Sequence, residues 1–141
     1  MASGMYDRFK ANLMNGEVDL GNGGDVIKVI LMKEAHSFTS THNVIGDVDA
    51  NELDAGGGYT QKDKVLAGQA VTQGASTKWD GTDVEWAGAT FSTWHAVLYD
   101  DTHATDDLIC TIDFGGEKAV AAGIFKIKWH VNGIINLATA A

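Results

Sequence analysis

The first apolar positions of the chain recur with the spacing of a helix. Met5, Phe9 and Leu13 are four residues apart, which places them on one helical face. Ser3 can cap the start and Asn15-Gly16 can end it. The pattern predicts an N-terminal helix over residues 5–14. Its three apolar side chains are candidates for an interface with a partner, and packing on the protein's own sheet is the alternative.

After the helix, the pattern changes to that of strands. Residues 25–33 are β-branched and almost continuously apolar, which predicts a central strand buried on both faces. Residues 34–58 are polar and irregular, although a short helix near residues 43–51 is compatible with them. Further strands are expected at residues 64–72, around Trp79, Trp86 and Phe91, and at residues 94–99 and 108–114, where Gly115-Gly116 closes the strand.

The last third of the chain carries the cleanest alternation. Within residues 124–131 the odd positions are apolar and are expected to face inward, while two lysines and a histidine face outward. Asn132-Gly133 favours a tight hairpin turn, with residues 134–137 as the returning strand. The inward-facing side chains of this strand are Phe125, Ile127, Trp129 and Val131.

These elements together predict a mainly β fold. About eight strands separated by frequent glycine are typical of an antiparallel β-sandwich or a partly open barrel, here with a short N-terminal helix. We find no repeat or linker that divides the chain, so we expect a single domain over residues 1–141, with the sandwich over residues 25–138.

The charge balance changes the picture of possible partners. Ten Lys and Arg residues face nineteen Asp and Glu residues, for a net charge of -9. This balance argues against binding to nucleic acid or to anionic membranes. The N-terminus lacks the pattern of a secretory signal, and no apolar stretch approaches a membrane span, so we expect a protein that is made and kept in the cytoplasm or is released only when the cell lyses. Cys110 is the single cysteine, expected as a buried apolar residue.

One segment has the spacing of metal ligands. Its oxygen-bearing side chains recur as at the start of a calcium loop: Asp47, Asp49, Asn51 and Asp54. Such a loop needs glycine at its sixth position and glutamate at its twelfth, where this chain has Glu52 and Gly58. We therefore expect a solvated acidic loop, with a cation site as the alternative, and no cofactor.

A second acidic cluster surrounds His103 between two predicted strands. It consists of Asp100, Asp101, Asp106 and Asp107. Paired carboxyl groups can perform acid–base chemistry when burial separates their pKa values. No apolar run surrounds this cluster, so the sequence predicts a solvated hairpin tip.

Other catalytic patterns are missing from the sequence. The five histidines lack close metal-ligand spacing, and the chain has neither a nucleophile elbow nor a phosphate-binding loop. The tryptophans are expected mainly in the core, with stacking on a sugar as the alternative; they are Trp79, Trp86, Trp94 and Trp129. The residues therefore indicate a structural or binding protein, not an enzyme.

Short motifs follow one another along almost the whole chain. They lie at residues 6–10, 17–20, 25–29, 41–42, 56–60, 83–86, 89–91, 95–99, 112–115 and 129–137. In their order and spacing the chain resembles a family of small virion proteins from tailed bacteriophages. The resemblance extends from about Tyr6 to Leu137, and its motifs are short and structural, so its weight comes from their number and order.

The resemblance implies a particle component present in many copies. The expected role is that of a capsid decoration (cement) protein, which binds the assembled shell and stabilises it. Its partners would be the major capsid protein or other virion proteins, and it would form a homo-oligomer, for example a trimer. It would be made in the cytoplasm of the bacterial host and located in the virion. A tail or fibre component, or a module that binds a host glycan, is the alternative, and the resemblance implies no catalytic residues.

Overall fold

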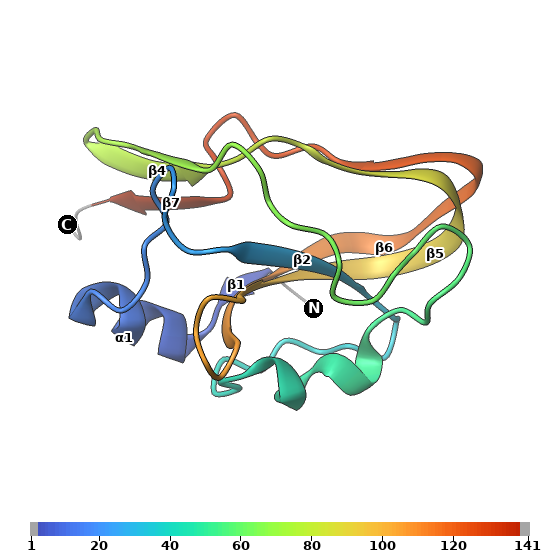
Figure 1. Ribbon diagram of the computed structural model, residues 1–141, viewed down its shortest axis with the longest axis horizontal. Coiled ribbons are helices and arrows are strands. Elements are labelled where there is room, and N and C mark those ends of the chain that lie inside the picture. The colour runs from blue at the N-terminus through green and yellow to red at the C-terminus, as the bar shows by residue number, and fades with distance from the viewer. Residues whose placement is uncertain (1–2, 139–141) are drawn as a thin grey trace.

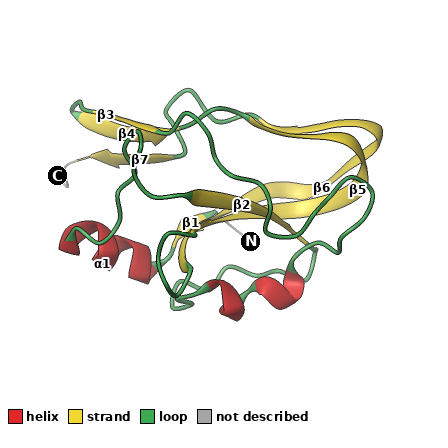
Figure 2. Cartoon of the chain, viewed as in Figure 1, coloured by secondary structure: helices red, strands yellow, loops and turns green. Residues whose placement is uncertain are grey.

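The computed structural model describes residues 3–138; residues 1–2 and 139–141 lie outside the described part. Seven strands form two antiparallel sheets, with strand orders β1-β6-β5-β2 and β3-β4-β7. Neither sheet closes into a barrel, and the predicted mainly β fold with one short N-terminal helix is confirmed (Figure 1, Figure 2). The elements are β1 (Gly4–Met5), α1 (Asp7–Asn15), β2 (Ile27–Met32), 3-10 turns at Ile45–Asp47 and Asp49–Asn51, β3 (Ala70–Thr72), β4 (Ser76–Asp80), β5 (Val84–Asp100), β6 (Asp107–Ile127) and β7 (Ile135–Ala138).

One long bent hairpin, β5 with β6, builds most of the architecture. The two strands pair from Asp100 and Asp107 at the loop to Val84 and Ile127 at the far end. In Figure 1 the hairpin leaves the sheet that holds β2, bends through the side of the molecule and returns in the layer of β4 and β7. We call residues 107–114 of β6 its lower limb and residues 117–127 its upper limb.

Glycines make this bend, where the sequence pattern predicted strand ends. Gly88 has a φ of 58° and Gly116 a φ of 141°, values that a residue with a side chain rarely adopts. Register shifts in the β5–β6 ladder accompany them, as expected where extra residues increase strand bending. The prediction that Gly115-Gly116 ends a strand was therefore wrong, because the pairing with β5 continues through the bend.

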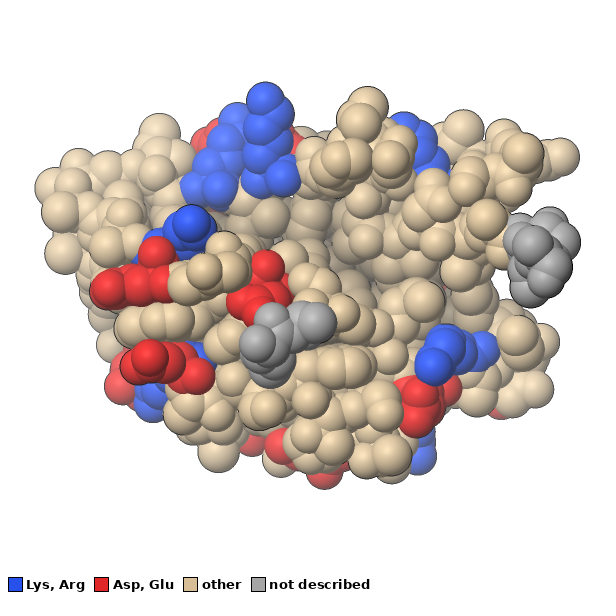
Figure 3. Space-filling model, turned by 180° about the vertical axis from the view of Figure 1, so that it is seen from behind, with Lys and Arg blue, Asp and Glu red and all other residues tan. Residues whose placement is uncertain are grey.

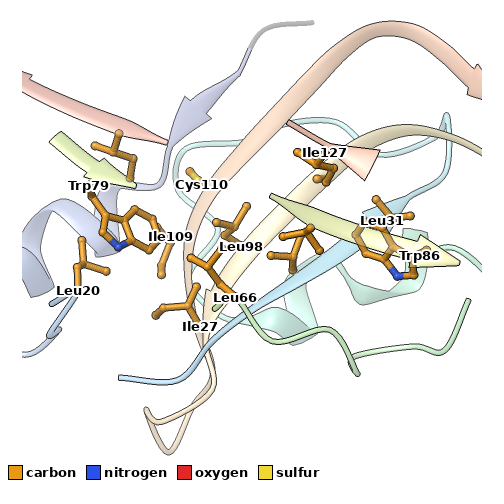
Figure 4. Packing of buried hydrophobic residues seen from close by; sticks show 14 of the residues in the cluster. Leu20, Ile27, Leu31, Leu66, Trp79, Trp86, Leu98, Ile109, Cys110 and Ile127 are labelled. Atoms are coloured by element: carbon orange, nitrogen blue, oxygen red, sulfur yellow. The ribbon is translucent and has the colours of Figure 1, made fainter. Parts of the chain in front are cut away.

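The prediction that residues 25–33 are buried on both faces is confirmed by β2. Ile27 and Leu31 point into the core between the two layers, where Trp79 and Trp86 also lie (Figure 4). Ile30 points to the opposite face, into a second core. This second core is covered by the segment that carries the two 3-10 turns and by Tyr6; it consists of Tyr6, Ile30, Met32, Ile45, Val48, Val97, Tyr99 and Leu108.

The expected central position of β2 needs a correction. In the regular ladder β2 is an outer strand, and its free edge is covered by the irregular residues 51–66. The Val29 amide donates to the Lys64 carbonyl at 2.9 Å, and the Leu53 amide donates to the Leu31 carbonyl at 2.8 Å. The backbone groups on this edge of β2 are thus hydrogen-bonded to a segment without regular secondary structure, a cover that edge strands commonly need.

The helix begins later than the apolar spacing predicted. Met5 belongs to β1 and pairs with Cys110 of β6, so α1 begins at Asp7 and ends against Gly16, which has a φ of 71°. The Tyr6 hydroxyl, 2.6 Å from the Thr111 hydroxyl, fixes the residue between strand and helix. Among the described residues, no helix is long and apolar enough to cross a bilayer.

The C-terminal hairpin was predicted incorrectly. A turn does form, with the Gly133 amide donating to the His130 carbonyl at 2.8 Å. However, β7 pairs with β4 and not with β6, because the Ile134 amide donates to the Trp79 carbonyl at 2.7 Å and directs the chain to the other sheet. Val131, expected inward, is 78% exposed.

Two other expected elements are shorter than predicted. Only Ala70–Thr72 of the expected strand over residues 64–72 is regular, and the short helix expected near residues 43–51 is a pair of 3-10 turns. Residues 64–66 instead bond to β2, so long-range pairing overrides their local preference.

Candidate functional site

A groove of about 810 Å³ lies between the two limbs of β6. Ile112 and Phe114 contribute from the lower limb, and Ile124 and Phe125 from the upper limb, with Trp129 just beyond it. All five side chains are apolar, and Ile124 is 63% exposed. The bend of the hairpin therefore leaves an apolar groove along one open side of the sandwich.

The floor of the groove is held by aromatic packing that continues into the core. The ring of Phe125 lies 5.4 Å from that of Phe91, 5.9 Å from that of Trp86 and 6.1 Å from that of Phe114. Trp129 donates its indole N–H to the Thr82 carbonyl at 3.0 Å. These contacts fix the lining in place, so the groove is a preformed feature.

The backbone beside the groove forms an exposed sheet edge. On the side away from β5, the described residues pair with β6 only on its lower limb, where β1 pairs at Cys110 and Thr111 and Val44 forms a bridge with Asp107. Within residues 3–138, no strand pairs with this side of the upper limb. Unpaired backbone donors and acceptors of this kind are a template for an added strand.

The rim of the groove is basic in an acidic protein. Residues 117–128 contain Glu117 and the exposed lysines Lys118, Lys126 and Lys128, against a net charge of -9 for the whole chain. Lys126 pairs with Glu85 at 3.1 Å, whereas Lys118 and Lys128 make no ion pair with any described residue. Figure 3 shows Lys and Arg side chains along the upper border of this side, with Asp and Glu side chains below them.

The predicted interface residues of the N-terminus mostly face inward. Phe9 is only 1% exposed and belongs to the core, so its proposed contact with a partner is corrected to internal packing. Met5 and Leu13 are partly buried against the same core. The apolar spacing arose because this segment seals the protein's own sheet.

The structure does not bring the candidate metal ligands together. Asp47 accepts the Asn43 and Val44 amides at 2.8 and 3.1 Å. Each of the other carboxylates has a lysine partner: Asp49 with Lys62 at 2.8 Å, and Asp54 with Lys33 at 2.9 Å. Asn51 lies in the second 3-10 turn. Within the described part of the chain, no cluster of three or more His, Cys, Asp or Glu side chains could hold a metal ion.

The predicted solvated tip at residues 100–107 was wrong for its two flanking aspartates. Asp100 and Asp107 are each 2% exposed and oppose one another at the root of the hairpin. Asp107 accepts a hydrogen bond from Asn12 at 2.8 Å and lies 3.3 Å from Arg8. Helix α1 therefore covers the Asp107 side of the loop root and buries a carboxyl group that the local sequence made appear solvated.

Two histidines were not anticipated as a pair. His36 and His95 are 4% and 6% exposed, and their rings are 5.3 Å apart in an edge-on arrangement. His36 Nε2 lies 3.3 Å from the Thr111 hydroxyl. Burial, helped by the nearby charges of His95 and His42, lowers the pKa of His36 to about 4. A neutral, packed imidazole is the result, and no sequence spacing could have indicated it.

Cys110 is buried as expected, but its strand does not alternate regularly between the two cores. A register shift places Leu108 in the second core, while Cys110 faces the first. Burial raises the pKa of the Cys110 thiol to about 12. Because the thiolate is the reactive form, we expect the native thiol not to react with a disulfide reagent at pH 8 and to react fully in denaturant. Rapid reaction of the folded protein would contradict this burial.

The tryptophans divide between core and groove. Trp79 and Trp86 are 3% exposed and belong to the core. Trp94 and Trp129 are half-buried, and Trp129 lines the groove. Tryptophan is a residue type enriched at the centre of protein interfaces.

Comparisons with protein-family models, with curated proteins and with solved structures found no match for this chain. The groove on β6 combines apolar side chains, free backbone groups and two unpaired ammonium groups. Such an arrangement can bind a chain segment by burial, backbone hydrogen bonding and charge.

Proposed function

We propose that the protein is a structural component of a tailed-phage virion, and more specifically a decoration protein that binds the assembled capsid shell and stabilises it. The observation that carries the proposal is the preformed groove of β6, with its basic rim, on a rigid bent hairpin. The sequence resemblance to small virion proteins supports it independently. The protein would be located in the virion after synthesis in the cytoplasm of the host.

The physical mechanism is bridging between neighbouring shell subunits. A stable contact buries on the order of 1,200 to 2,000 Å², and the groove would form the centre of that area. The net charge of -9 keeps free copies apart in solution, so clustering into a homo-oligomer, for example a trimer, would occur on the shell.

Binding to bare shells tests this function. Purified protein is expected to cosediment with capsid shells that lack decoration, to saturate, and to raise the melting temperature of the shells. Ile124→Asp should weaken binding at least tenfold, because it places a carboxylate in the apolar groove. Ile124 is 63% exposed, so the variant should fold.

Val71→Asp is the matched control, because Val71 is a 50% exposed β-branched residue on β3, away from the groove. It should bind shells as the natural sequence does. A protein that fails to bind shells would exclude a decoration role, and binding to isolated tails instead would assign it to the tail.

A further inference from the structure

We infer that the upper limb of β6 receives an extended segment of a partner protein, rich in alternating apolar and acidic residues, which adds to the sheet as a strand. The inference rests on the proposed function in that the partner would be a shell protein, and it specifies how that contact is made. The partner is an extended segment of a different protein and not a second copy of this chain.

The backbone of β6 indicates where the strand would add. On the lower limb, β1 occupies the edge at Cys110 and Thr111, and the Asp113 and Gly115 amides already donate to the side chains of Ser3 and Asp113 at 2.9 Å each. The upper limb lacks such cover within the described residues, apart from the Ala122 amide, which donates to the Thr90 hydroxyl. The free edge therefore runs along residues 117–127, with a bulge at Ala122 (φ 48°) that interrupts its regular pairing. A partner strand of about eight residues would cross this bulge.

The groove supplies the second part of the recognition. A strand on this edge has side chains that alternate between the two faces of the sheet. Those on the inner face would enter the groove beside Phe125 and Trp129, with Phe114 on the opposite limb. Aliphatic side chains at every second position fit this surface, whereas charged ones there would be buried without a partner.

The charges select an acidic partner. Lys118 and Lys128 form no ion pair with a described residue, and they lie near the two ends of the free edge. Lysine on an edge strand opposes pairing between identical edges, because a twofold contact would bring the same lysines together and like charges on opposed strands are destabilising. Carboxylates on the outer face of a partner strand would relieve this repulsion, so the edge is open to an acidic segment and closed to another copy.

The test uses the full chain and a defined probe. The probe is a capped eight-residue peptide in which isoleucine and aspartate alternate. We expect one peptide to bind per protein, with NMR shifts concentrated on the amides of residues 117–127 and slowed hydrogen exchange there. A peptide with lysine in place of aspartate should bind at least tenfold more weakly, and so should the acidic peptide with alternate amides N-methylated, because methylation removes the strand-pairing donors.

Charge-reversed proteins give the matched comparison. The Lys118→Glu/Lys128→Glu variant should lose at least tenfold in affinity for the acidic peptide. The Lys10→Glu/Lys33→Glu variant changes the net charge equally at lysines paired with Asp7 and Asp54, and it should bind as the natural sequence does.

Three results would overturn the inference: no binding of the acidic peptide, equal binding of its N-methylated form, or self-association of the protein through protected β6 amides. Shell binding without peptide binding would refute this inference and leave the proposed function standing. Peptide binding without shell binding would refute the proposed function and leave strand addition to β6 standing.

Discussion

Replacing Tyr59 with Phe is expected to lower the free energy of unfolding by about 3 kcal/mol, because one hydroxyl joins two groups that cannot reach water. Tyr59 is 3% exposed and Glu52 is 2% exposed. The Tyr59 hydroxyl donates to Glu52 Oε2 at 2.8 Å and accepts the Leu31 amide at 3.0 Å. The substitution leaves both a buried carboxylate oxygen and a strand amide with one partner fewer.

The consequences should extend to the covered edge of β2. Burial raises the pKa of Glu52, and the hydrogen bonds from the Tyr59 hydroxyl and the Lys62 amide oppose that rise. Removing the hydroxyl should raise the pKa of Glu52 further and loosen residues 51–66, whose contacts satisfy β2. We expect faster hydrogen exchange at Val29 and Leu53 in this variant.

Urea unfolding at pH 7 measures the effect, and Tyr6→Phe is the matched control. Tyr6 is fully buried, but among the described residues its hydroxyl bonds only to the neutral Thr111 hydroxyl, so its loss should cost about 1 kcal/mol. Equal losses for the two variants would show that the Glu52 contact adds nothing.

Local pattern was sufficient for the parts of the fold that depend on burial alone. The apolar run of β2 was correctly predicted to have two buried faces, since cores on both sides require it. The alternation of Phe125, Ile127 and Trp129 against lysines correctly indicated one apolar and one basic face, and these faces became the lining and rim of the groove. The place of Phe114 on the other side of the groove could not be predicted, because only the bend of β6 brings Phe114 opposite the upper limb.

Structural features that depend on contacts between residues far apart in the sequence could not be predicted. A Gly-Gly pair can end a strand or bend it, and continued pairing with β5 made Gly115-Gly116 a bend. Asn132-Gly133 made a turn as expected, but hydrogen bonding to Trp79 carried the following strand to the other sheet. The aspartates beside His103 appeared solvated because the residues that bury them, such as Asn12, are almost a hundred positions away.

These two buried aspartates should respond to pH in opposite directions. Burial raises the pKa of Asp100 to about 7, and the adjacent carboxyl group of Asp25 adds to that rise. Asp100 Oδ2 has no donor among the described residues, so the ionised form is poorly satisfied, whereas a protonated Asp100 can donate to Asp25. The pKa in the unfolded chain is near 3.8. Stability from this group is therefore full below pH 3.8 and is lost as the pH rises through about 7.

Asp100→Asn should consequently stabilise the protein at pH 8, on the order of 2 kcal/mol, and should change little at pH 4. The asparagine oxygen can still accept the Thr102 amide, which lies 3.0 Å from Asp100 Oδ1, and its amide can donate to Asp25 as the protonated acid would. Thermal unfolding of both proteins across pH 4 to 8 gives the measurement, with the gap in melting temperature expected to widen as the pH rises.

Asp107→Asn is the control, since it makes the same chemical change at the opposing residue. Burial acts to raise the pKa of Asp107, but hydrogen bonds from Thr105 and Asn12 and the charges of His103 and Arg8 lower it overall. Its stabilising contribution is present above the unfolded pKa of about 3.8 and is lost as the pH falls through the lower folded value. Asp107→Asn should therefore destabilise the protein at pH 8, where Asp100→Asn stabilises it. Since total charge changes equally in both variants, opposite signs would show that local solvation, and not relief of the net charge, controls this loop; equal signs would refute that explanation.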